Sequence, residues 1–236
     1  MAAALSRSSR LRTAALWPVG IALTSWHYMW RTTPMHRSEV SGADDTPPAL
    51  PADLSSDGLQ RIEDGVGSIF HRRYTARIGD AKASPDELLD RIKADPNCAS
   101  PTEFARFHKI RGGDGTLRAG DEFIVRMPGP WDGPVRVAHV GPASFLLATL
   151  AGHLEAGQIE FRAWSDDGEL HFCVESWARS GDRLSNLLYA HLRMAKEVQL
   201  HMWTSFLERV AELAGGRLRG GIEIVTRRIE GIDVVP

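Results

Sequence analysis

Residues 182–214, DRLSNLLYAHLRMAKEVQLHMWTSFLERVAELA, decide the fold of this chain. The stretch contains neither proline nor glycine, and Gly215-Gly216 follows it directly. Its mostly apolar side chains recur at steps of three and four residues, the period of one helical face: Leu184, Leu188, His191, Ala195, Val198, Met202, Phe206, Val210 and Leu213. At 1.5 Å per residue the pattern predicts a single helix of about 50 Å.

The residues before this helix alternate between apolar and polar, as β-strands do. Five short runs carry the alternation, with glycine- and proline-rich turns between them: Glu122–Met127, Val135–Val140, Ser144–Leu150, Gln158–Trp164 and Glu169–Trp177. In the second run we expect Val135, Val137 and His139 on one face and Arg136, Ala138 and Val140 on the other. Because the connections are short, the strands should form an antiparallel meander. This sheet is the only partner large enough to cover the apolar stripe of the long helix.

The elements around this unit complete the expected order. Residues Ile69–Ile78 resemble a strand. Two similar signals follow, Ser84-Pro85-Asp86-Glu87 and Ser100-Pro101-Thr102-Glu103, and each places a capping serine, a proline and a glutamate at the start of a helix. Residues Ile222–Ile229 are expected either to add an edge strand or to pack loosely. The fold class is therefore α+β: a helix-grip arrangement in which an antiparallel sheet wraps around one long C-terminal helix.

The N-terminus has a different composition from the rest. Residues 14–30, AALWPVGIALTSWHYMW, are uncharged and lie near the lower limit of about 17 residues for a membrane-spanning helix. Tryptophans and a tyrosine near its ends are typical of membrane interfaces. We expect residues 1–37 to form an N-terminal hydrophobic helix that anchors the chain in the cell membrane, with no firm prediction for the side on which the main domain lies. The alternative is an amphipathic or core-packed helix in a cytoplasmic protein.

Prolines and small or acidic residues then dominate, so we expect residues 38–64 to be a linker and residues 65–236 to be the folded domain. A net charge of −2 and a pI near 6.5 argue against a nucleic-acid-binding protein. Cys98 and Cys173 are too few for a disulfide framework or a zinc site. No phosphate loop, dinucleotide fingerprint or nucleophile motif is present in the sequence. We therefore expect neither a cofactor nor a metal.

Residues 148–213 resemble a family of unknown function, common in actinobacteria, within the START-like (SRPBCC) superfamily. The resemblance covers roughly residues 65–215. The matching positions are Thr149, Leu150, Gly152, His153, Glu155, Gly157, Glu160 and Phe161, followed by Trp177 and Arg179. Leu154 and Gln158 depart from the pattern, since other members usually carry proline and glutamate there. The resemblance implies a cavity between sheet and long helix that binds lipids, polyketides or other apolar molecules.

The glycine-bounded turn GHLEAG, residues 152–157, contains the sharpest candidate chemistry. His153 with Glu155 or Glu160 has the groups for acid–base catalysis, although loop-stabilising hydrogen bonds are the simpler interpretation. The residues expected to line the ligand site are Trp131, Trp164, Trp177, His191 and Met202.

Three functions are consistent with these observations. The first is binding of an apolar small molecule or lipid, the second is a cyclase- or hydrolase-like enzyme, and the third is a membrane-associated protein-interaction module.

Overall fold

A computed structural model describes residues 33–41, 47–102, 105–127, 132–181 and 193–229 of the chain. In these residues nine strands form one sheet in the order β1-β9-β2-β8-β7-β6-β5-β4-β3. The strands are β1 (Met35–Ser41), β2 (Val66–Gly79), β3 (Arg106–Arg111), β4 (Glu122–Arg126), β5 (Asp132–Val140), β6 (Ser144–Thr149), β7 (Glu155–Asp166), β8 (Glu169–Ser180) and β9 (Arg217–Ile229). The helices are α2 (Pro85–Ala94) and α4 (Arg193–Leu213), with 3-10 turns η1 (Ile62–Asp64) and η2 (Pro96–Cys98).

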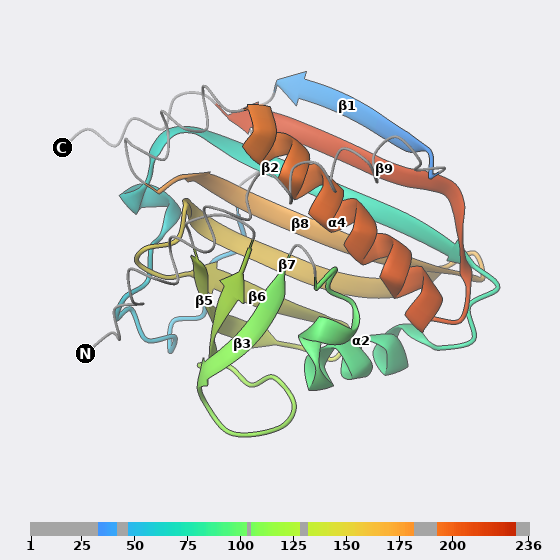
Figure 1. Cartoon of the computed structure of the whole chain (residues 1–236), viewed down its shortest axis with the longest axis horizontal. Coiled ribbons are helices and arrows are strands. Elements are labelled where there is room, and N and C mark those ends of the chain that lie inside the picture. Colours follow the sequence, from blue (N-terminus) through green and yellow to red (C-terminus); the bar gives the residue numbers. More distant parts are fainter. Residues whose placement is uncertain (1–32, 42–46, 103–104, 128–131, 182–192, 230–236) are drawn as a thin grey trace, which may run out of the picture.

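The strands from β3 to β8 form the expected antiparallel meander. Helix α4 lies across one face of this sheet, as Figure 1 shows, and α2 lies near the C-terminal end of α4. We call the face toward α4 the inner face. Apolar side chains from β2, β7 and β8 and from α4 meet there in the main core, which includes Tyr74, Ile78, Phe161, Phe172, Val174, Phe206, Leu207 and Val210.

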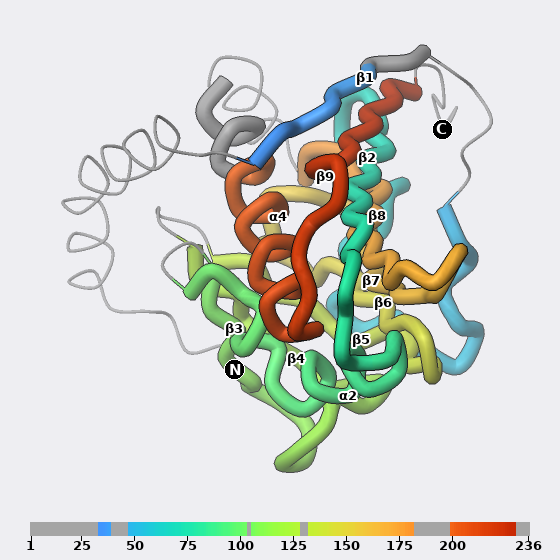
Figure 2. The backbone as a smooth tube through the Cα atoms, turned by 90° about the vertical axis from the view of Figure 1, so that its right-hand side faces the viewer, coloured from blue at the N-terminus to red at the C-terminus, as the bar shows by residue number. Residues whose placement is uncertain are grey.

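The opposite, outer face is covered in part by the segment that precedes β2. Figure 2 shows this segment on the side of the sheet away from α4. Leu50, Leu54 and Leu59 pack there against a small cluster formed by Ala138, Leu146 and Ala148. Part of the expected linker therefore packs on the sheet, while the division into residues 1–37, 38–64 and 65–236 stays a prediction.

The described part of α4 covers Arg193–Leu213, 21 residues. The start of the predicted helix, residues 182–192, lies outside the described residues, so the structure gives no support for a helix of the full predicted length. The predicted end is confirmed. Gly215 adopts a φ of 67°, and its N–H donates to the Glu212 carbonyl at 2.9 Å, which closes the last turn.

Of the two predicted short helices, one is confirmed. Ser84 caps α2, because its hydroxyl accepts a hydrogen bond from the Glu87 N–H while the Glu87 carboxylate accepts one from the Ser84 N–H. The matching signal at Ser100 does not start a helix, and this prediction was wrong. The Ser100 hydroxyl donates to the Ala105 carbonyl at 2.5 Å instead, and the chain enters β3 at Arg106.

Two details of the sheet differ from the prediction. The register of β5 against β6 shifts between Val137 and His139, so Val137 and Val140 pack with the main core while Ala138 packs on the outer face. This bulge interrupts the strict alternation expected for the strand. Strand β9 is also not an edge strand, because β1 pairs with it in parallel along its far side.

The apolar segment 14–30 lies outside the described residues. In the ranges that the structure does describe, no helix combines the length and apolarity needed to cross a bilayer.

Candidate functional site

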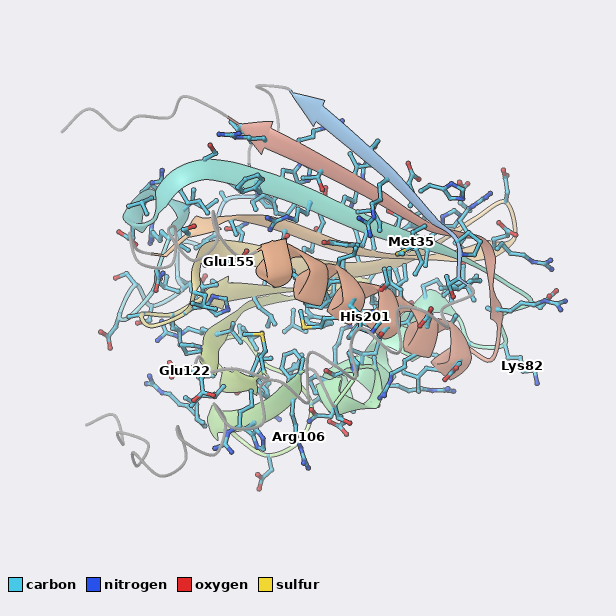
Figure 3. All side chains as sticks on the ribbon, turned by 45° about the horizontal axis from the view of Figure 1, so that its top comes forward. Met35, Lys82, Arg106, Glu122, Glu155 and His201 are labelled. Carbon is cyan, nitrogen blue, oxygen red and sulfur yellow. The ribbon has the colours of Figure 1, made fainter. Side chains whose placement is uncertain are left out.

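Three polar side chains meet between the inner face of the sheet and α4. Arg72 on β2 and Glu155 at the start of β7 form an ion pair, with 3.3 Å between Nη1 and Oε1. Gln199 on α4 donates from Nε2 to the other Glu155 oxygen at 3.1 Å. Arg72 is only 5% exposed. We call these three residues the inner polar cluster. Figure 3 shows Glu155 beside the N-terminal end of α4.

Strand alternation explains why these charges point inward. Arg72 has the same parity as the core residues Tyr74 and Ile78 on β2, and Glu155 has the same parity as Phe161 on β7. The register of β7 against β8 is continuous from Glu155 to Asp166, so the alternation holds throughout that strand.

The inner face near this cluster carries unusually small side chains. Ser176, Ala178 and Ser180 alternate along β8, and Gly157 on β7 lies opposite Ala178. A Cβ atom at Gly157 would lie 2.1 Å from the Trp177 carbonyl oxygen, so no larger residue fits there. Ile159, the next inward residue of β7, is only partly buried although its strand is central. This part of the inner face therefore presents small side chains and a partly buried isoleucine.

The other end of the interior is filled by large side chains. Phe161 is stacked on Phe145, with ring centroids 4.6 Å apart. Trp203 of α4 meets Phe161 and Phe206 edge-on, at centroid distances of 5.7 and 5.9 Å. Met202, one of the expected ligand-binding residues, is buried in the same core. Because Phe206 and Leu207 are at most 2% exposed, this half serves as a packed core.

The GHLEAG turn binds the backbone and side chain of Gln60, which precedes β2. The Gly152 N–H donates to the Gln60 side-chain oxygen, and the Gln60 amide donates to the His153 carbonyl, both at 3.2 Å. Thr149 and Gly157 both bind the Gln60 carbonyl, Thr149 through its hydroxyl at 2.8 Å and Gly157 through its N–H at 3.2 Å. Four of the motif positions quoted above therefore hold one residue of the segment on the outer face.

His153, Glu155 and Glu160 do not form a common catalytic group. The His153 Nδ1 atom accepts a hydrogen bond from the Glu155 backbone N–H at 2.9 Å, and burial of the ring lowers the pKa of His153. The carboxylates of Glu155 and Glu160 point to opposite faces of β7, because the two residues are five positions apart in an unbroken strand. The Glu155 carboxylate binds Arg72 inside, whereas that of Glu160 binds Arg162 outside at 3.0 Å.

A second polar cluster lies on the outer face and joins four charged or titratable side chains. Glu175 on β8 binds His71 at 2.7 Å and Arg162 at 2.5 Å, and Arg162 also binds Glu160. The His71 ring is stacked on Trp177 at 4.9 Å with an interplanar angle of 2°. Burial alone would raise the pKa of Glu175, but the hydrogen bonds and charges of His71 and Arg162 outweigh it, so its pKa lies below the usual value.

The expected ligand-binding residues therefore separate. Met202 lies on the inner side, whereas Trp177 and Trp164 lie on the outer face, where Trp164 is stacked on His171 at 5.2 Å. Trp131 and His191 lie outside the described residues. The sequence also offers Trp203 as a pocket-lining residue and His71, Arg72 and Arg73 as a possible site for an anionic group, and of these Arg72 lies in the inner polar cluster. Sequence reasoning missed Gln199, whose position on the helix is not marked by any local pattern.

Several solved structures share similarity with the chain. Protein Ms6760 from Mycobacterium smegmatis is 16% identical, with a TM-score of 0.42 over 71% of this chain and 98% of that one. The hypothetical protein jhp0584 from Helicobacter pylori is 9% identical, with a TM-score of 0.45 over 73% and 99%. The major latex-like protein 151 from Panax ginseng is 11% identical, with a TM-score of 0.47 over 62% and 97%. These likenesses are too remote to carry an argument about ligand or activity.

A search of curated proteins finds no match to the chain. A protein-family model, in contrast, matches residues 68–209, from β2 to the last turns of α4, and includes the motif turn and both polar clusters. This match covers more than half of the chain, which therefore belongs to the DUF1990 family, a domain of unknown function.

Proposed function

We propose that the protein binds an apolar small molecule or lipid between the inner face of the sheet and α4. The observation that carries this proposal is the inner polar cluster, an Arg72–Glu155 ion pair joined by Gln199 between the sheet and α4, next to the apolar main core. Burying two charges costs several kcal/mol per ion, and their mutual attraction rarely returns more than that. A charged pair at this place is therefore better explained by recognition of a ligand's polar end than by stability.

The small side chains of β8 support the same location. A ligand above Ser176, Ala178 and Ser180 would have its polar end at the cluster and its apolar body toward Ile159. Desolvation of that body would supply about 25 cal/mol per Å² before the costs of association.

Displacement of anilinonaphthalene sulfonate from the purified chain by saturated alcohols of increasing length tests the proposal. We expect affinity to rise with chain length, by a factor of about 4 for each buried CH₂ group at about 0.8 kcal/mol. Ser176→Leu places a large side chain among the small residues of β8 and should abolish binding of the alcohols. The matched control is Ser165→Leu, the same change at an exposed position of β7. A folded protein that binds no alcohol, or a Ser176→Leu variant that binds as the wild type does, would overturn the proposal.

We also propose that residues 14–30 hold this binding domain at a membrane. Thr33 and Pro34 already contact the folded body, through hydrogen bonds to Glu208 and Ile222, so few residues would separate the segment from the domain. Fractionation of cells that express the chain with and without residues 1–32 tests this part. Recovery of the full chain in the soluble fraction would contradict it.

A further inference from the structure

Trp203 carries a buried hydrogen-bond donor that the packing of the core does not use. The residue is 9% exposed and lies between α4 and the sheet, edge-on to Phe161 and Phe206. Its indole Nε1 atom is enclosed, and no acceptor within the described part of the chain lies at hydrogen-bond distance from it. Indole N–H groups can only donate, so this atom has no second way of being satisfied.

An indole at this position costs more free energy than a hydrocarbon side chain that fills the same part of the core. A buried donor without an acceptor loses its hydrogen bond to water and gains none in return. Phenylalanine and leucine, which fill the neighbouring positions Phe206 and Leu207, supply apolar surface without this penalty. The Trp203 N–H is thus better explained if a hydrogen-bond acceptor reaches it in another state of the protein, such as a complex with a ligand.

The position of Trp203 on α4 connects it to the inner polar cluster. It lies four residues after Gln199, so the two side chains share one helical face about 6 Å apart along the axis. The donor therefore lies where the proposed ligand would pass from its polar end at Gln199 toward the aromatic core.

We propose that the ligand carries an uncharged oxygen acceptor, such as a ketone or ester carbonyl, that accepts a hydrogen bond from Trp203 Nε1. This inference rests on the proposed function and narrows its ligand class from any apolar molecule to one with a carbonyl within its apolar body. A neutral acceptor suits the place, because a full charge there would be buried among aromatic rings without a partner. Since Nε1 is enclosed, binding moves neighbouring side chains aside to admit the carbonyl.

The test compares two probes of equal length, 2-decanone and decane, by displacement of anilinonaphthalene sulfonate from the full chain. Wild-type protein is expected to bind the ketone about tenfold more tightly than the alkane, which corresponds to about 1.4 kcal/mol. Trp203→Phe removes the donor and should remove or reverse this preference, because the buried ketone oxygen then has no hydrogen-bond partner.

Trp177→Phe is the matched control, because Trp177 also has a buried Nε1 atom that lacks an acceptor among the described residues but lies on the outer face. This variant should keep the preference for the ketone. If Trp203→Phe fails to fold, benzothienylalanine placed at position 203 replaces the N–H by sulfur with the ring shape retained, and the same loss of preference is expected.

The outcomes separate the two proposals. Equal binding of ketone and alkane by the wild type, or a ketone preference that survives the loss of the Trp203 donor, overturns the inference and leaves the proposed function standing. Binding of neither probe overturns both. Thermal unfolding of the unliganded protein gives an independent readout when the ring shape is retained: benzothienylalanine at position 203 should leave the midpoint unchanged or raise it, and a marked fall would show that the N–H has a partner in the free protein.

Discussion

On the outer face, the carboxylate of Glu175 is bound by both His71 and Arg162. Its pKa lies below the usual 4.5 because these two partners outweigh the effect of burial. A carboxyl group with a lowered folded-state pKa stabilises the fold above its unfolded-state pKa, and this contribution is lost as the pH falls through the folded-state value.

We expect Glu175→Gln to lower the free energy of unfolding at pH 7 by about 1–3 kcal/mol, because Arg162 and His71 lose a charged partner inside the sheet. The difference from the wild type should shrink as the pH falls below 4.5 and through the lowered folded-state pKa of Glu175, where the carboxyl group of the folded wild type also becomes protonated. Urea denaturation at pH 7 and at pH 3.5 measures both values. A difference that stays the same at the two pH values would contradict the assignment.

His153 should produce a second, separate dependence on pH. Burial lowers its pKa below the usual 6.5, so the ring is neutral in the folded chain and charged in the unfolded chain at lower pH. The stability that follows from this is complete above pH 6.5 and falls as the pH drops below it, down to the folded-state pKa.

Replacing His153 by Asn keeps a side-chain acceptor for the Glu155 N–H but removes the titration. We expect His153→Asn to show no loss of stability just below pH 6.5, where the wild type loses it. Chemical denaturation in steps from pH 7.5 to pH 5 gives the two curves. Parallel curves would mean that His153 is not the group responsible.

At the scale of elements, the sequence predicted best those features that depend on residues close together in the chain. The capping box at Ser84 and the helix end at Gly215 are local, and both are confirmed. A nearly identical capping signal at Ser100 does not start a helix, because the residues that follow pair with β4, and this pairing overrides a weak local helix preference. The bulge in β5 reversed the expected faces of His139 and Val140 for the same reason.

The candidate site was less predictable because its parts are far apart in sequence. Alternation alone places Arg72 and Glu155 on inward faces, but their contact crosses β8 and joins residues 83 positions apart. The partner of the GHLEAG turn is also distant, since Gln60 precedes His153 by 93 positions and lies in a stretch with the composition of a linker. No local pattern marks a single glutamine in such a stretch as structural.

The segment that carries Gln60 should therefore contribute to stability. Gln60→Ala removes two side-chain hydrogen bonds to the motif turn, and we expect the free energy of unfolding to fall by about 1–3 kcal/mol. Asp57→Ala, an exposed change three residues earlier, is the control and should have an effect within about 0.5 kcal/mol. Guanidinium denaturation compares the three proteins. Equal midpoints for all three would show that the turn does not depend on this contact.

At the scale of the whole molecule, the sheet continues past β2 on the side away from the meander. The chain leaves α4, turns at Gly215 and returns as β9 along β2, and β1 then pairs in parallel with β9. This addition ties the N-terminal region to the last strand of the fold, because Pro34 accepts a hydrogen bond from the Ile222 N–H and Thr33 donates to Glu208 on α4. Strand pairing thus includes Met35–Ser41 in the sheet, ahead of the predicted start of the folded domain at residue 65.

Two truncations test where the folded body starts. Removal of residues 1–32 leaves β1 and its contacts in place, so we expect the thermal midpoint to stay within about 2 °C of that of the full chain. Removal of residues 1–41 also deletes β1, exposes the edge of β9 and should lower the midpoint by about 5–10 °C. The longer truncation should also aggregate more readily, because an unprotected edge strand can pair with a second copy. Equal midpoints and equal solubility for the two truncations would contradict a structural role for β1.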